Sequence, residues 1–136
     1  MHNAIYILTT DAYDKIYGAS ERADINELVN MIAPQQTAES IAAHPELLVD
    51  IDVIFSGWGM ARLDEDFLAA APNLKAVFYG AGSIRGFATD AVWDRGIIIC
   101  SAWAANAVPV SEYTLAQILF SLKRGWYHAL TIKREQ

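Results

Sequence analysis

The chain has 136 residues, of which 54% are hydrophobic and 19% are charged. This length and composition are typical of a folded domain with its own apolar core, and they exclude a generally disordered chain. Because the formal net charge is −6 and no basic stripe is present, the chain is a poor candidate for binding nucleic acid.

The sequence also shows no secretory signal, no membrane span and no pair of cysteines. The N-terminal Met1-His2-Asn3 lacks the basic region of a secretory signal, and the apolar stretch that follows it stops at Leu8. No apolar run reaches the ~18 residues that a membrane span needs. The single cysteine, Cys100, excludes an internal disulfide, and its place at the end of an apolar run predicts a buried side chain. We therefore expect a cytoplasmic protein with no membrane or nucleic-acid partner.

Short apolar segments rich in β-branched and aromatic residues alternate with helical segments along the chain. Asp11, Thr37 and Asp64 stand where helix caps are expected, and Gly18 and Gly96 stand where helices end. In chain order the sequence predicts strand 4–9, helix 12–18, strand 27–32, helix 38–48, strand 52–56, helix 65–71, strand 74–79, helix 89–94 and strand 97–100.

Most of the expected strands are continuous apolar runs, which is typical of a parallel sheet covered on both faces. We therefore predict an α/β fold with a flavodoxin-like open sheet of about five parallel strands and helices on both faces. Ligands of such sheets bind at the carboxyl ends of the strands. The loops to consider are 9–12, 56–60, 79–87 and 101–106.

The segment from Asn106 to about residue 130 predicts one long helix with apolar side chains nearly all round. Such a helix needs burial on both sides, and one small domain can cover only one side. We expect the missing cover to be a second domain, a partner subunit or both. The apolar residues of one face are Leu115, Ile118, Leu119, Leu122, Trp126 and Leu130, and those of the opposite side are Tyr113, Ala116, Phe120 and Tyr127.

The sequence Gly80-Ala81-Gly82 directly follows the expected strand 74–79. It resembles the start of a dinucleotide-binding loop, but Arg85 stands where that loop has its third glycine. Two other interpretations stay open. The glycines can simply allow a tight turn, or the backbone N–H groups of Ala81 and Gly82 can form a nest that binds a carboxylate.

Other candidate residues lie at the same expected edge of the sheet. Trp58 and Gly59 follow the third strand and Trp103 follows the fifth, so these residues either line a cleft or serve packing. The third strand has no aspartate at its end, which argues against a phospho-receiver domain. The three histidines lack the spacing of metal ligands or of a catalytic triad, so we expect no metal site.

Five short motifs between residues 72 and 112 share the spacing of one known family. They are Pro72-Asn-Leu-Lys75, Gly80-Ala-Gly82, Arg95-Gly-Ile97, Asn106 and Val110-Ser-Glu112. In these motifs the chain resembles the D-isomer-specific 2-hydroxyacid dehydrogenases, in particular their phosphoglycerate-dehydrogenase-like branch. The first 71 residues agree with the family only in their alternation of strands and helices.

The resemblance implies an NAD-dependent, two-domain enzyme that moves a hydride between a nicotinamide and a small 2-oxo or 2-hydroxy acid. Residues 1–105 would be the substrate domain, and residues 106–136 would begin the NAD-binding Rossmann domain. The helix over 106–130 would join two subunits into a homodimer. The substrate carboxylate would bind at the Gly80-Ala81-Gly82 loop, with Trp58, Gly59, Trp103 and Asn106 near it.

The family's catalytic Arg, Glu or Asp, and His lie downstream of the matching region. We therefore expect no catalytic residue in this chain and no turnover by it alone. Ile84 and Phe87 replace aspartates that are common in the family, and Trp58 replaces a polar or basic side chain. These differences indicate a less charged cleft than a phosphorylated substrate would need. The alternative is a stand-alone domain without catalytic activity that binds carboxylates or forms a dimer.

Overall fold

The computed structural model describes residues 1–135, and the chain separates into two compact units. The first unit runs from Met1 to Ala102 and the second begins at Trp103. The division thus falls three residues before the end of the expected substrate domain. The two units are described separately below.

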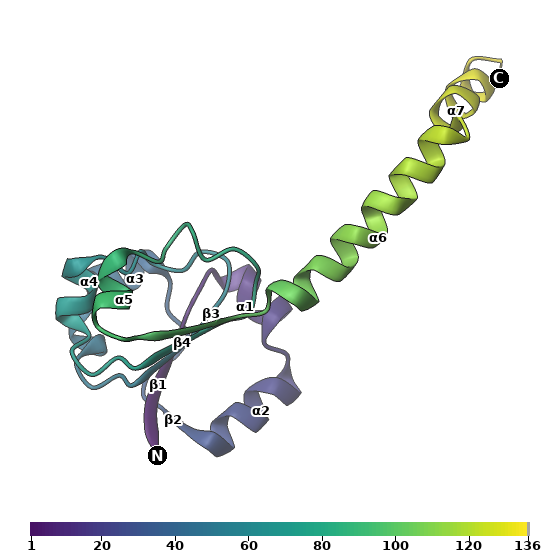
Figure 1. Ribbon diagram of the computed structural model, residues 1–136. Coiled ribbons are helices and arrows are strands. Elements are labelled where there is room, and N and C mark those ends of the chain that lie inside the picture. Colours follow the sequence, from purple (N-terminus) through teal and green to yellow (C-terminus); the bar gives the residue numbers. More distant parts are fainter. Residues whose placement is uncertain (136) are drawn as a thin grey trace. The chain divides into compact units, whose positions relative to one another are not determined.

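The first unit is an α/β domain built on a parallel sheet of five strands (Figure 1). The strand order is β2-β1-β3-β4-β5, which is the flavodoxin-like order and confirms the predicted fold class. The strands are β1 (His2–Ile7), β2 (Val29–Met31), β3 (Val53–Ser56), β4 (Ala76–Tyr79) and β5 (Ile98–Ser101). The helices are α1 (Thr10–Ile16), α2 (Ala19–Leu28), α3 (Ala38–Ala43), the 3-10 helix η1 (Pro45–Leu48), α4 (Glu65–Ala70) and α5 (Asp90–Asp94).

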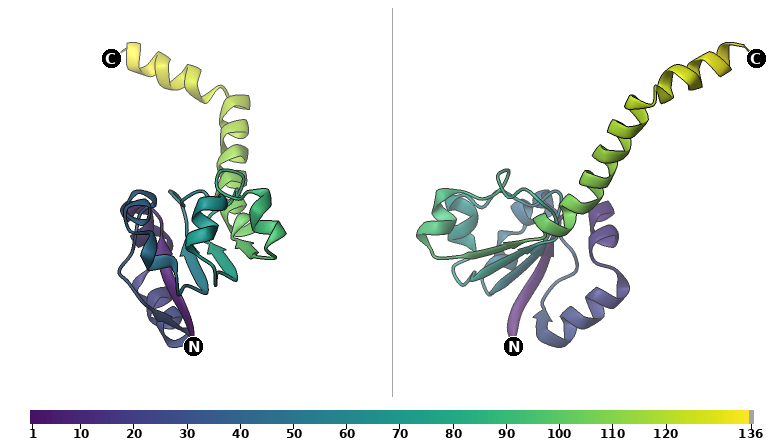
Figure 2. Two further views of the ribbon diagram at one scale, coloured as in Figure 1. Left: turned by 90° about the vertical axis from the view of Figure 1, so that its left-hand side faces the viewer. Right: turned by 45° about the vertical axis from the view of Figure 1, so that its right-hand side comes forward.

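Helices cover the two faces of the sheet unequally (Figures 1 and 2). On one face, α3, η1, α4 and α5 enclose the main core, to which Ile5, Ile54 and Val77 contribute from three neighbouring strands. On the other face, Tyr6 and Leu8 pack with Ala12 and Tyr17 of the α1 region. Because side chains alternate along a strand, β1 and β3 contribute to both cores, Ile5 and Ile54 on one face and Tyr6 and Phe55 on the other.

The second face is uncovered over β4 and β5 within the first unit. Phe78 is 41% exposed, Ile98 is 63% exposed, and Cys100 is exposed as well. The prediction that Cys100 is buried is therefore wrong. An apolar run indicates a strand with two apolar faces, but it does not ensure that a helix of the same unit covers both.

Most expected elements are shifted by one or two residues at their ends, and the prediction lacks α2, which follows Gly18. Two further elements differ more strongly. The segment 27–32 begins as the end of α2, so only Val29–Met31 is a strand. The expected helix 38–48 is broken at His44, because Pro45 cannot continue α3 and instead begins η1. At the other end of α3, Thr37 and Ser40 form a reciprocal capping box.

The second unit consists of two helices, so the expectation of one continuous helix is wrong. Helix α6 spans Trp103–Leu122 and α7 spans Gly125–Arg134. Between them Arg124 adopts the left-handed conformation with φ 56°. A Cβ atom at Gly125 would lie 2.4 Å from the ring of Phe120, and that ring packs edge-to-face on Trp126 with centroids 5.2 Å apart. These contacts hold the bend.

A charged cluster joins three strands at the edge opposite their carboxyl ends. The Asp52 carboxylate accepts a hydrogen bond from the ammonium of Lys75 at 2.6 Å and another from the backbone N–H of Asn3 at 3.0 Å. These two hydrogen bonds lower the pKa of Asp52 to about 2. Since Asn3 lies in β1, and Asp52 and Lys75 directly precede β3 and β4, the cluster stabilises the order in which these strands pair.

We predict that Asp52→Asn lowers the free energy of unfolding by about 1–2 kcal/mol at pH 7, reduced from the full effect of the pKa shift because Lys75 is exposed. The folded pKa lies below the unfolded value of about 3.9, so the stabilisation is complete above that value and is lost as the pH falls towards 2. Urea unfolding at several pH values measures this difference. A gap between wild type and variant that persists at pH 2, or equal loss in the exposed control Asp24→Asn, would contradict the prediction.

Two buried tyrosines on the α1 face differ in their hydrogen bonding. The Tyr17 hydroxyl donates to the carbonyls of Ser56 at 2.8 Å and Phe78 at 3.2 Å, which ties α1 to β3 and β4. The Tyr6 hydroxyl is buried and has no hydrogen-bond partner among residues 1–135. Burial raises the pKa of Tyr6 to about 12, so this hydroxyl is neutral at physiological pH.

We therefore expect opposite results from the same substitution at these two positions. Tyr17→Phe removes a bonded hydroxyl and should cost about 1–3 kcal/mol of unfolding free energy. Tyr6→Phe removes an unpaired buried hydroxyl and should leave stability unchanged or raise it by about 1 kcal/mol. Chemical denaturation of both variants tests the pair, and equal destabilisation by the two would show that the hydroxyl bonds do not matter.

Candidate functional site

The loops after β1, β3 and β4 are joined by backbone hydrogen bonds at the carboxyl edge of the sheet. The N–H of Thr9 donates to the carbonyl of Trp58 at 2.9 Å. The N–H of Gly80 donates to the carbonyl of Ser56 at 2.8 Å. The predicted residues Trp58, Gly59 and Gly80 to Gly82 thus lie in loops at the carboxyl edge, where ligands of such sheets commonly bind. The strand order reverses between β1 and β3, so Trp58 and Gly59 border the reversal point, whereas Gly80 to Gly82 follow the next strand, β4.

Two of the glycines are required by packing. Gly59 has φ +83°, and a Cβ atom there would lie 2.4 Å from Cγ2 of Thr9. A Cβ atom at Gly80 would lie 2.3 Å from Cγ2 of Ile16 in α1. Both positions therefore exclude larger residues whether or not a ligand binds. This observation favours the packing interpretation for Gly80.

The next two residues of the loop have backbone N–H groups that the fold does not use. The N–H of Gly80 is used within the fold, but the N–H groups of Ala81 and Gly82 donate to no acceptor among residues 1–135. The Ser101 hydroxyl donates to the carbonyl of Gly82 at 3.0 Å and so fixes the loop to the end of β5. Ala81 is only 1% exposed, whereas Gly82 is half-buried. Gly82 is thus the accessible donor.

Asp11, the first charged residue after β1, already has hydrogen-bond partners. The Asp11 carboxylate accepts hydrogen bonds from the Thr9 hydroxyl at 2.9 Å and from Lys15 at 3.1 Å. These bonds lower the pKa of Asp11, so the group is ionised at neutral pH. Asp11 therefore lacks the raised pKa of a general acid. Neither Asp11 nor the Gly80–Gly82 loop thus supplies a general acid at this edge.

Trp103 and Asn106 do not lie in the first unit. The expected loop 101–106 ends at Ala102, because α6 already begins at Trp103. Both side chains are exposed in the first two turns of α6, with Trp103 68% exposed. The residues that the first unit brings to the carboxyl edge are therefore Trp58, Gly59 and the Gly80–Gly82 loop.

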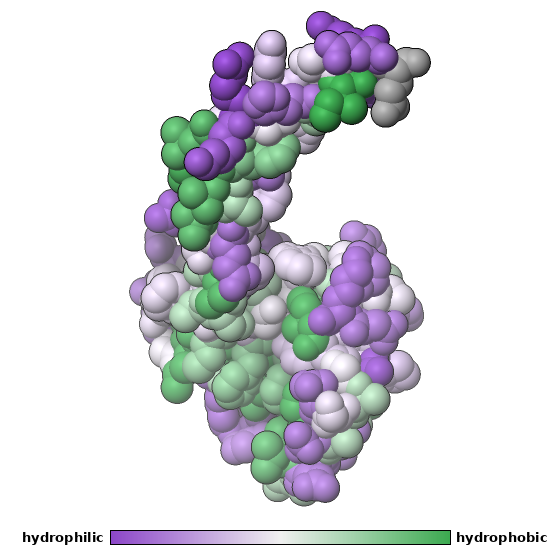
Figure 3. Space-filling model, turned by 90° about the vertical axis from the view of Figure 1, so that its right-hand side faces the viewer, coloured by the Kyte–Doolittle hydropathy of each residue, from purple (hydrophilic) through white to green (hydrophobic). Residues whose placement is uncertain are grey.

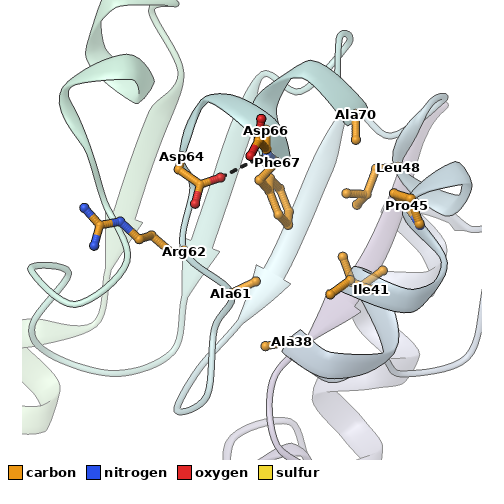
Figure 4. Close-up of a pocket in the computed structure, with 11 residues that line it drawn as sticks. Ala38, Ile41, Pro45, Leu48, Ala61, Arg62, Asp64, Asp66, Phe67 and Ala70 are labelled. Carbon is orange, nitrogen blue, oxygen red and sulfur yellow. Dashed lines mark hydrogen bonds between the residues drawn. The ribbon is translucent and has the colours of Figure 1, made fainter.

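Sequence reasoning missed a groove of about 400 Å³ between α3, η1 and α4 (Figure 4). Ile41, Leu48 and Phe67 form its apolar walls. Asp64 lies at its rim, where its carboxylate accepts the N–H of Phe67 at 3.1 Å and caps α4. The only sequence signal at this groove is the capping residue, which predicts a helix and no ligand.

Several residues that carry the family resemblance have structural roles in this fold. Lys75 pairs with Asp52, and the Asn73 amide donates to the carbonyl of Val49 at 2.8 Å. The Arg95 guanidinium donates to carbonyls at the end of α4, those of Leu68, Ala71 and Pro72. Gly96 has φ +67°, a conformation that favours glycine. Of the motifs in the first unit, only the Gly80–Gly82 loop presents unused polar groups at the carboxyl edge.

The Gly80–Gly82 loop lacks the geometry of a dinucleotide-binding loop. In such a site a helix begins directly in the glycine-rich loop, and its N-terminus binds the pyrophosphate. Here α5 begins only at Asp90, well beyond Gly82, and it has five residues. The loop that resembles the start of an NAD-binding motif is therefore not followed by the helix that would bind the pyrophosphate of NAD.

Comparison of the chain with protein-family models, curated proteins and solved structures finds no match. None of the helices within residues 1–135 has both the length and the apolar character that crossing a membrane requires. Over the same residues, no group of three or more His, Cys, Asp or Glu side chains is arranged to hold a metal ion.

Proposed function

We propose that the first unit is the substrate domain of an NAD-dependent D-2-hydroxyacid dehydrogenase, and that its Gly80–Gly82 loop binds the carboxylate of a small 2-oxo or 2-hydroxy acid. The observation that carries this proposal is the pair of N–H groups at Ala81 and Gly82 without an acceptor. They follow β4 at the carboxyl edge of a sheet with the flavodoxin-like order. The family resemblance of residues 72–112 gives the class of substrate.

The chemistry of the loop suits a carboxylate better than a neutral ligand. Hydrogen bonds from N–H groups to an ionised oxygen are shorter and stronger than those to a neutral one. Because Ser101 holds the Gly82 carbonyl, the loop is ordered before the ligand arrives, which lowers the entropy cost of binding. Gly82 would make the first hydrogen bond, and the buried Ala81 N–H would contribute less.

The surroundings of the loop favour a small, unphosphorylated acid. Trp58 is half exposed at the same edge, and Phe87 is buried against Tyr79 with ring centroids 4.7 Å apart. Arg85 is the one basic side chain between residues 80 and 90. A phosphorylated acid would need several cationic partners, so pyruvate, glyoxylate and lactate are more suitable ligands.

In an enzyme of this class NAD supplies or accepts a hydride, and this chain's part is to bind and orient the acid. The first unit presents amide donors to the carboxylate, and the loop lies at a sheet edge that a second domain could close against water. The second unit would join two subunits through the segment 106–130, which comprises most of α6 and the first part of α7.

We predict that pyruvate binds the chain with a dissociation constant in the millimolar range, about −4 kcal/mol, as expected for a ligand of a few atoms. In a nitrogen-15 NMR titration the amide signals of Gly82 and, to a smaller extent, Ala81 should shift. The amide of Gly96 is the matched control because it lies in another turn. Methyl pyruvate, which has no charge, should cause no shift, and equal shifts with the ester would contradict carboxylate recognition.

A second prediction concerns turnover. Because the described residues include neither a dinucleotide site nor a general acid at the loop, the chain alone should not oxidise NADH. Absorbance at the NADH band with pyruvate, glyoxylate or hydroxypyruvate, followed at high protein concentration, is the direct assay. A rate above the no-protein control that scales with the amount of chain would refute the assignment of this segment as a substrate domain without catalytic groups.

The alternative function is a stand-alone domain that binds carboxylates or forms a dimer without catalysis. It is favoured by the exposed apolar residues of α6 and α7, which need a partner of some kind. The two functions differ in the expected behaviour of the chain in solution. A stand-alone domain should form a stable, monodisperse dimer, and a well-behaved monomer in light scattering would remove the main support for this alternative.

A further inference from the structure

The arginines of the first unit differ in their partners. Arg22 pairs with Asp14 at 2.9 Å, and the Arg95 guanidinium donates to backbone carbonyls. Arg62 and Arg85 are exposed, and neither guanidinium forms an ion pair or a hydrogen bond within residues 1–135. A guanidinium has five N–H donors in a planar arrangement that suits carboxylates and phosphates. The two free groups are therefore candidates for binding an anion.

The backbone holds the segments that carry Arg62 and Arg85 against each other. These segments leave β3 and β4 at the carboxyl edge of the sheet. The N–H of Leu63 donates to the carbonyl of Phe87 at 2.9 Å, and the Thr89 hydroxyl donates to the carbonyl of Leu63 at 2.5 Å. Leu63 and Phe87 are buried, so their junction is part of the core. Arg62 directly precedes Leu63 and Arg85 lies two residues before Phe87, so both arginines lie beside this junction.

Arg85 also lies close to the loop whose N–H groups are unused. Gly82 precedes it by three residues, so their Cα atoms are at most about 11 Å apart. Arg85 stands in a turn in which the N–H groups of Phe87 and Ala88 donate to the carbonyl of Ile84 at 3.2 Å and 3.0 Å. Ile84 packs against the main core, and Phe87 is buried in it. Because the turn is anchored on both sides of Arg85, the backbone of Arg85 has a fixed position relative to Gly82.

The Arg62 side chain points away from the apolar walls of the groove beside α4 (Figure 4). Asp64, Glu65 and Asp66 follow it in the cap and the first turn of α4. The surroundings of the two arginines are therefore not strongly positive. They suit a group with one negative charge better than a phosphate group, which carries about 1.5 to 2 charges at neutral pH.

We propose that Arg62 and Arg85 bind a second carboxylate of the ligand, so that the site takes a dicarboxylic 2-oxo or 2-hydroxy acid such as malate. This inference rests on the proposed function, in which Gly82 binds the first carboxylate. A guanidinium can form two parallel hydrogen bonds to one carboxylate, which fixes the orientation of the ligand as well as its charge. A ligand with a single carboxylate leaves both guanidinium groups unused.

Three acids that share a 2-hydroxy acid group test this proposal on the 136-residue chain. D-malate carries a second carboxylate that D-lactate lacks, and 3-phospho-D-glycerate carries a phosphate group instead. In nitrogen-15 NMR titrations followed at the Gly82 amide, D-malate should bind at least about tenfold more tightly than D-lactate, as expected for hydrogen bonds between charged groups. Arg85→Gln should remove this preference and leave D-lactate binding unchanged. Arg62→Gln should reduce the preference.

Arg134→Gln is the matched control for the loss of one positive charge. Arg134 is an exposed arginine at the hydrophilic end of α7, outside the first unit (Figure 3). This variant should keep the preference for D-malate. An equal loss of preference in Arg134→Gln and Arg85→Gln would show that the net charge of the chain sets the affinity, and it would overturn the proposal.

The outcomes separate this inference from the proposed function. If neither D-lactate nor D-malate shifts the Gly82 amide, the first carboxylate site is absent and both proposals fail. If D-lactate shifts it but D-malate binds no more tightly, only the second carboxylate site is overturned. If Arg85→Gln weakens both acids equally, Arg85 holds the first carboxylate instead. Tighter binding of 3-phospho-D-glycerate than of D-malate would contradict the choice of a carboxylate.

Discussion

The position of α1 on the sheet depends on a contact that only glycine permits. The side chain of Ile16 occupies the space where Cβ atoms of residues 57 and 80 would lie, at 2.3 Å from each. Because these glycines follow β3 and β4, one isoleucine packs on the ends of two central strands. This close approach brings the Tyr17 hydroxyl within reach of the Ser56 and Phe78 carbonyls. The Gly80–Gly82 loop then leaves the sheet from a fixed starting point.

Of the motifs that carry the family resemblance, most have structural roles, and one forms the candidate site. Lys75 pairs with Asp52, the Arg95 guanidinium donates to carbonyls at the end of α4, and Gly96 forms a turn with positive φ. Only the loop at Ala81 and Gly82 presents unused polar groups at the carboxyl edge. Most motifs of the resemblance thus have structural roles in the first unit, and the functional proposal rests on two backbone N–H groups.

Most of the sheet could be predicted because every strand except β2 contains a short apolar run with clear stops. The order of the strands followed from the few ways in which a parallel sheet can be wound. The bend at Arg124 could not be predicted from that residue, since arginine favours helices. Its signal was Gly125, whose significance depends on the ring of Phe120. The exposure of Cys100 was missed because a single strand does not show what lies over its neighbours.

The candidate site was predicted in part for a similar reason. Residue types indicated the Gly80–Gly82 loop, since glycine spacing after a strand is visible in sequence. Which of its N–H groups are free depends on the Ser56 carbonyl and the Ser101 hydroxyl, and both come from other strands. The groove beside α4 was missed altogether, because its apolar lining has no distinctive sequence pattern.

The bend between α6 and α7 restricts how the length of α6 can vary among related chains. Phe120, Gly125 and Trp126 form one packed unit, so the direction of α7 is fixed relative to the last turn of α6. Each residue inserted earlier in α6 would rotate this unit by about 100° around the helix axis. Insertions of three or four residues nearly restore the direction of α7, whereas insertions of one or two point it to another side.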